Sequence, residues 1–174
     1  MFRDKLKNLV DILREQYEIA AYPIGIKDLR RLAKAVGAEI RYDDFGDELS
    51  GFSYQRNGLK VIGVNSKHSP ARQKFTIAHE LGHLFLHKQN AVNFDEASIL
   101  LRDSHSSEGT DTKEIEANGF AAELLMPQEK IREELVRLGG IDMEDEKQMS
   151  QLANHFGVSK TAITVRLTSL YLNR

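Results

Sequence analysis

One segment restricts the fold of this chain more than any other: two histidines four residues apart, with a glutamate between them. The segment reads His79-Glu80-Leu81-Gly82-His83. In a helix, residues four apart lie on the same face, so both imidazoles can bind one metal ion while Glu80 lies beside it. The flanking side chains predict a largely buried helix; they are Phe75, Ile77, Ala78, Leu81, Leu84, Phe85 and Leu86. Because burying two His and a Glu is costly unless they are bonded, we expect a metal there rather than a chance match with solvated histidines.

Composition limits the ligands that such a metal can have. The chain has 174 residues, six His and no Cys. The absence of Cys excludes a disulfide scaffold, a thiol nucleophile and a Cys-ligated zinc finger, so His and carboxylates must bind any metal. The net charge of −2, from 24 Lys+Arg and 26 Asp+Glu, argues against a protein that works mainly by coating nucleic acid.

The length is that of about one domain. The first twenty residues carry a charge every few positions, unlike the apolar core of a signal peptide. No stretch approaches the roughly 20 apolar residues of a membrane span. We therefore expect a soluble, cytoplasmic protein without a membrane partner.

Hydrophobic periodicity predicts an α+β fold. Two N-terminal helices, a small three-stranded, mostly antiparallel sheet and a set of later helices follow one another. The expected helices are 1–20, 27–36, 69–88, 114–125, 128–138, 147–156 and 160–170, and the expected strands are 38–42, 51–55 and 59–65. Asn57-Gly58 predicts a hairpin between the last two strands. The polar stretch 103–113 predicts a mobile loop. We divide the chain into a main domain, 1–140, and a C-terminal helical segment, 141–174, packed on it.

A catalytic metal site needs a third protein ligand. His87 continues the stripe of His79 and His83, but eight helical residues span about 12 Å and a zinc–nitrogen bond is about 2 Å. We therefore expect His87 to lie near the last carbonyls of its helix instead. A metzincin-type third histidine would fall at position 89, which is Gln89.

The helix 114–125 then supplies the carboxylate. We choose Glu116 as the third ligand, with Glu123 as the alternative, because residues seven apart share a face. The competing interpretation is that both are solvated glutamates. The apolar residues of this helix are expected to face the core; they are Ile115, Phe120, Leu124 and Leu125.

Two motifs together resemble the ImmA/IrrE family of zinc metallopeptidases: residues 75–83, Phe-Thr-Ile-Ala-His-Glu-Leu-Gly-His, and residues 116–127, Glu-Ala-Asn-Gly-Phe-Ala-Ala-Glu-Leu-Leu-Met-Pro. The resemblance implies a minimal gluzincin-like metallopeptidase fold over residues 1–140. It also implies Zn²⁺ bound by His79, His83 and Glu116, with Glu80 as the catalytic base. Candidate oxyanion donors are Arg72, Tyr54, His68 and His105. An edge of the predicted sheet is expected to pair with an extended substrate, and proline substitutions along the exposed edge of the strand 59–65 would test this.

The C-terminal residues 151–167 are typical of a helix-turn-helix, with a turn at Gly157 and an N-cap at Ser159. From Ser150 to Arg174 the basic residues are Lys160, Arg166 and Arg174, and none is acidic. This charge is slight for phosphate contacts, so we favour a helical pair that packs on the main domain over one that binds DNA.

The sequence thus predicts a zinc-dependent endopeptidase. The family resemblance implies a protein substrate, a helix-turn-helix repressor of the Xre/Cro type, whose cleavage derepresses mobile-element, phage or stress-response genes. The alternative is a DNA- or partner-binding regulator, or a toxin–antitoxin component, with a non-catalytic zinc site. Glu80 favours catalysis, because a structural site has no need of a base beside an open metal position.

Overall fold

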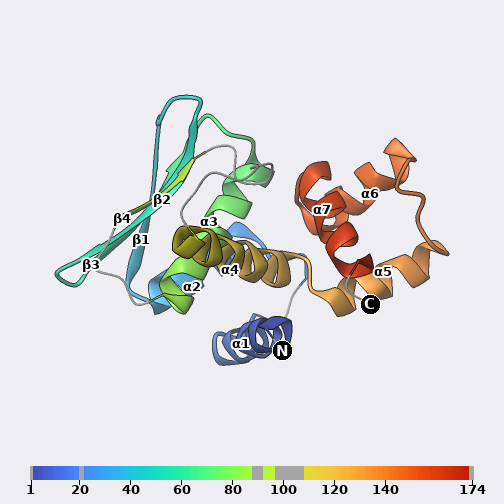
Figure 1. Ribbon diagram of the computed structural model, residues 1–174, viewed down its shortest axis with the longest axis horizontal. Helices are drawn as coiled ribbons and strands as arrows, with labels where there is room; N and C mark the ends of the chain where they lie inside the picture. The colour runs from blue at the N-terminus through green and yellow to red at the C-terminus, as the bar shows by residue number, and fades with distance from the viewer. Residues whose placement is uncertain (1, 20–21, 88–91, 97–107, 173–174) are drawn as a thin grey trace.

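A computed structural model of the protein describes residues 2–19, 22–87, 92–96 and 108–172. Its helices are α1 (Phe2–Gln16), α2 (Ile26–Ala35), α3 (Pro70–Leu86), α4 (Glu108–Leu125), α5 (Gln128–Leu138), α6 (Glu146–Phe156) and α7 (Lys160–Tyr171). Its strands are β1 (Ala38–Asp43), β2 (Leu49–Arg56), β3 (Leu59–Asn65) and β4 (Val92–Glu96). Figure 1 shows the sheet at one end of the molecule and α5, α6 and α7 at the other, with α3 and α4 between them.

The strands form one sheet in the order β1-β3-β2-β4. β2 pairs antiparallel with both β3 and β4, whereas β1 pairs parallel with β3. Asn57 and Gly58 both have positive φ, as a two-residue hairpin turn requires. The predicted α+β class is confirmed, and β4 adds a strand that sequence periodicity did not indicate.

α3 is the helix that packs on the sheet. It starts where the sequence predicts: Ser69 Oγ accepts a hydrogen bond from the backbone N–H of Arg72, and Pro70 occupies the first helical position. The approach to β2 is close, because a Cβ added to Gly51 would lie 2.4 Å from Thr76 Cγ2. Ile62 and Val64 of β3 and Ile77 and Leu81 of α3 are fully buried in the core.

α4 is longer than the sequence predicts. Residues 108–113 are helical, so the expectation of a loop there is wrong; residues 103–107 of that expected loop lie outside the described part of the chain. Ser, Gly, Asp and Thr favour loops only weakly, and a buried helix such as 117–125 can extend through them.

The C-terminal helices share the core of the rest of the molecule. Met149, Leu152 and Phe156 of α6 and Ile163 and Leu167 of α7 belong to the same buried cluster as the α3 side chains. Two buried cations add polar contacts across this junction. Lys74 of α3 donates to the carbonyl oxygen of Phe156 at 2.8 Å, and Arg166 of α7 donates to that of Met126 at 3.0 Å. The division at residue 140 remains a prediction from the sequence. Within the described ranges, no helix has the length and apolarity needed to cross a bilayer.

Lys74 makes the folding free energy depend on pH. Burial lowers its pKa from 10.5 to about 8. The charged amine therefore destabilises the folded state below about pH 8. Between pH 8 and pH 10.5 the folded protein has lost this proton, whereas the unfolded chain still holds it. The free energy of unfolding therefore rises with pH over this range, and the cost of burying the charge disappears.

We compare the unfolding free energy of Lys74→Met with that of the wild type. The difference in favour of the variant should be largest at pH 7. This difference should shrink by at most about 3 kcal/mol by pH 10.5. The variant also loses the hydrogen bond to the Phe156 carbonyl, but it lacks this bond at every pH. That loss therefore does not affect how the stability difference changes with pH. Urea unfolding of both proteins across this range checks the prediction, and a difference that does not change with pH would contradict it.

Candidate metal centre

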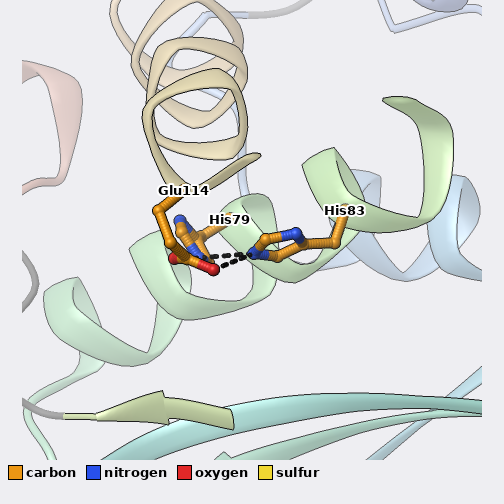
Figure 2. Close-up of side chains that lie close together, drawn as sticks. All are labelled: His79, His83 and Glu114. Carbon is orange, nitrogen blue, oxygen red and sulfur yellow. Dashed lines mark hydrogen bonds and ion pairs between the residues drawn. The ribbon is translucent and has the colours of Figure 1, made fainter. Parts of the chain in front are cut away.

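Three side chains from α3 and α4 converge on one point. His79 Nε2 lies 3.0 Å from His83 Nε2 and 3.2 Å from Glu114 Oε2, and His83 Nε2 lies 3.2 Å from Glu114 Oε1. Figure 2 shows the carboxylate of Glu114 directed from α4 at the two imidazoles. Both histidines are almost fully buried, whereas a quarter of the Glu114 side chain is exposed. The group is therefore largely enclosed by the protein.

These separations fit a metal ion. Ligands at about 2.0 Å from a tetrahedral ion lie about 3.3 Å from one another. The three closest ligand-atom pairs are 3.0, 3.2 and 3.2 Å apart. Two imidazole nitrogens and a carboxylate also match the His₂Glu donor set of catalytic zinc sites, in which a fourth position stays open.

Small residues allow the two helices to approach each other at the centre. A Cβ added to Gly82 of α3 would lie 3.0 Å from Ala117 Cα and 3.1 Å from the Ala117 carbonyl oxygen. Such contacts are tighter than side chains tolerate without a shift of the backbone. Glycine at 82 and alanine at 117 therefore set the spacing that lets Glu114 reach the histidines.

The electrostatics of the group suit a cation. Burial lowers the pKa of His83, which keeps the imidazole neutral at pH 7, the form that binds metals. Burial acts to raise the pKa of Glu114, but hydrogen bonds with His79 and His83 outweigh it and lower this pKa to about 2. The centre therefore offers a neutral His83 imidazole and one carboxylate anion at neutral pH.

Asn118 orients one of the imidazoles. Its Oδ1 accepts a hydrogen bond from His79 Nδ1 at 2.9 Å, which leaves the lone pair on His79 Nε2 directed toward His83 and Glu114. In contrast, His83 Nδ1 is buried without a hydrogen-bond partner among the described residues. The sequence analysis missed Asn118. Its signal was the spacing of four from Glu114, which places both on one face of α4.

We expect Asn118→Leu to weaken zinc binding about 10- to 100-fold, because the imidazole loses the acceptor that sets its tautomer. Asn118→Asp keeps an acceptor at the same place and should bind zinc at least as well as the wild type. Competition with a chelating dye measures both constants. Equal affinity of the leucine variant and the wild type would contradict this role.

The structure places the two predicted carboxylates elsewhere. Glu116 Oε2 lies 3.6 Å from His87 Nδ1, and Glu123 forms a buried ion pair with Arg166. The group of potential metal ligands among the described residues consists of His79, His83 and Glu114, so Glu114 takes the place for which the sequence favoured Glu116.

The rotation of α4 about its axis explains the difference. The sequence analysis turned Ile115 toward the core, but its side chain is 64% exposed. Phe120, Leu124 and Leu125 are buried as expected, and Ala117 and Ala121 lie on the same buried face. Two residues turn a helix by about 200°, so the rotation that exposes Ile115 brings Glu114 rather than Glu116 to the histidines.

Other expectations have mixed outcomes. Glu80 is buried on α3 beside the histidine pair.

Of the oxyanion candidates, Arg72 donates to Ser50 Oγ at 2.9 and 3.2 Å near the start of α3, and His105 lies outside the described residues. The oxyanion donor therefore remains unassigned. β3 lies between β1 and β2, so the expectation of an exposed edge on this strand is wrong. The outer strands of the described sheet are β1 and β4, and pairing of substrate with an edge of the sheet stays a prediction.

Comparison with known proteins gives the family. The model of the M78 peptidases, described as the IrrE N-terminal-like domain, matches residues 33–168. The chain belongs to this family. M78 relatives include the radiation response metalloprotease IrrE of Deinococcus radiodurans, 30% identical over 86% of this chain and 42% of that protein. The metallopeptidase ImmA of Bacillus subtilis is 32% identical over 63% of this chain and 54% of its own length.

A third relative of this M78 chain is an immunity region protein of Bacillus phage phi105, 36% identical over 46% of each protein. The chain thus spans about half the length of the curated relatives it matches. A solved Mycobacterium tuberculosis transcriptional regulator shares the fold, with a TM-score of 0.59 and 21% identity over 91% of this chain and 45% of that one.

Proposed function

We propose that this M78 domain is a zinc-dependent endopeptidase. The observation that carries the proposal is the convergence of His79, His83 and Glu114 beside the buried carboxylate of Glu80. A zinc ion there supplies Lewis-acid polarisation of a peptide carbonyl and makes a water molecule more acidic.

Glu80 has the role of general base. Its carboxylate accepts a proton from the attacking water and passes it to the nitrogen of the leaving amine. Asn118 holds His79 in the tautomer that leaves Nε2 free of a proton. Glu114, anionic down to low pH, completes the ligand set.

The proposed substrate is a helix-turn-helix repressor of the Xre/Cro type. The support comes from relatives: one is named as an immunity region protein of a phage and another as the metallopeptidase ImmA. Cleavage of such a repressor would derepress the phage, mobile-element or stress-response genes it controls. Because a repressor works on DNA, we place the proposed reaction in the cytoplasm.

The basic residues of the C-terminal helices support a packing role for this segment rather than DNA binding. Arg166 points into the protein, where it pairs with Glu123, and Lys160 pairs with Glu146 at the surface. A cation already paired inside the protein cannot contact phosphate. We therefore propose a protein substrate and no DNA partner. A gel shift at low salt with random DNA tests this, and tight, salt-sensitive binding would reverse it.

The proposed function predicts the behaviour of His83→Ala. Removing one ligand should abolish stoichiometric zinc and also abolish cleavage of an Xre-type repressor co-expressed with the protein. His155→Ala is the matched control, because His155 lies on α6 and is 45% exposed. Metal analysis and the fragment pattern of the repressor give the two readouts. Undiminished cleavage by zinc-free His83→Ala protein would disprove the zinc mechanism.

A further inference from the structure

The buried imidazole of His87 has no part in the proposed chemistry, although it lies one turn beyond His83 on the same face of α3. α3 ends at Leu86, and His87 follows with an extended backbone. Its side chain is 7% exposed, and its ring centroid lies 5.5 Å from that of His83. Burial of an imidazole is costly unless both nitrogens find partners, so the partners of His87 indicate its role.

Both partners belong to α4, and they lie on either side of Glu114 in the chain. His87 Nε2 donates to the carbonyl oxygen of Lys113 at 3.3 Å, and His87 Nδ1 lies 3.6 Å from Glu116 Oε2. The Nε2 atom carries the proton of this bond, since a carbonyl oxygen only accepts; the ion pair of Nδ1 with Glu116 forms when Nδ1 is protonated as well. One ring thus contacts the residue before Glu114 and the residue two after it.

Three contacts between α3 and α4 follow an antiparallel order. His79 meets Asn118, Gly82 meets Ala117, and His87 meets Lys113. The His87 contact is the one nearest the beginning of α4, beyond the close approach at Gly82 by about 7 Å along α3. Contacts spread along the axis of a helix fix its direction, and the His87 contact extends this set toward the start of α4.

We propose that His87 is a positioning residue for the metal centre. It fixes the second turn of α4 and so directs the Glu114 carboxylate at His79 and His83. The start of a helix lacks intrahelical partners for its first N–H groups and tends to fray. Without His87, that fraying reaches Glu114, and the carboxylate samples positions outside the ligand set. This inference rests on the proposed function.

The test compares zinc affinity in single and double variants. His87→Phe keeps a ring and loses both polar contacts, and it should weaken zinc binding about 10- to 100-fold. His87→Gln keeps a donor for the Lys113 carbonyl and should restore most of the affinity. His155→Phe, the same change at an exposed histidine of α6, should leave affinity unchanged. Chelator competition measures all of them.

If His87 acts on zinc binding through Glu114, its effect should depend on the presence of Glu114. In a Glu114→Gln background, His87→Phe should change zinc affinity by less than about two-fold, because the group it positions is already lost. A purely structural role would weaken both backgrounds equally. An equal effect in both backgrounds, or a His87→Phe affinity equal to that of the wild type, would overturn the proposal.

Amide hydrogen exchange of the metal-free protein separates this inference from the proposed function. His87→Phe should speed exchange at residues 113–117, and His155→Phe should not. If wild-type protein bound zinc but cleaved nothing, the proposed function would fail and the affinity cycle would still decide the role of His87. If the wild type bound no zinc, exchange alone would decide it, and unchanged exchange would overturn it.

Discussion

Glu80→Gln should bind zinc as the wild type does and lose peptide-bond cleavage by about 100- to 10,000-fold, the usual contribution of a general base. The amide has nearly the shape of the carboxylate, but it cannot accept a proton from water. Glu80 does not belong to the converging ligand group, so the metal should stay. Zinc content and the rate of repressor cleavage, measured on the same preparation, check both halves of this prediction.

The control for Glu80→Gln is Glu133→Gln on α5. Glu133 is 63% exposed and pairs with Lys130, so the same change there should leave zinc content and cleavage unaltered. Full cleavage by Glu80→Gln would exclude Glu80 as the base. If the wild type and the variant both bound zinc and neither cleaved the repressor, a non-catalytic site would be favoured instead.

Glu114→Gln and Glu116→Gln should differ sharply in zinc affinity. Glu114→Gln removes the anionic ligand, and the loss should exceed the roughly 100-fold that removal of an outer-shell partner costs. Glu116→Gln removes only the carboxylate 3.6 Å from His87, and its loss should stay within about 100-fold. Chelator competition at one pH compares the two variants directly.

The pair of variants contains its own control, because the same substitution is made two residues apart on one helix. The opposite order, with zinc lost in Glu116→Gln and kept in Glu114→Gln, would restore the ligand set that the sequence favoured. Circular dichroism of both variants should match the wild type, since Glu114 and Glu116 are each partly exposed.

Much of the fold follows from local sequence signals. Ser69 and Pro70 start α3 because a side-chain acceptor and a fixed φ suit the first turn of a helix. Asn57 and Gly58 form the hairpin because both tolerate positive φ. The left-handed Gly139 ends α5 where the sequence predicts its end. β4 and the start of α4 had no such signals, since their pairing and packing partners are distant in the chain.

For the metal centre, the sequence alone determined that His79 and His83 share one face of a helix, because their spacing of four is a local property of the α-helix. It also placed Glu80 beside them. Only the tertiary structure decided which carboxylate joins the pair. Glu114, Glu116 and Glu123 lie on the same helix, and each is polar enough to be solvated. The close packing of Gly82 against Ala117 sets how α4 is rotated, and that rotation directs Glu114 to the histidines, Glu116 to His87 and Glu123 to Arg166.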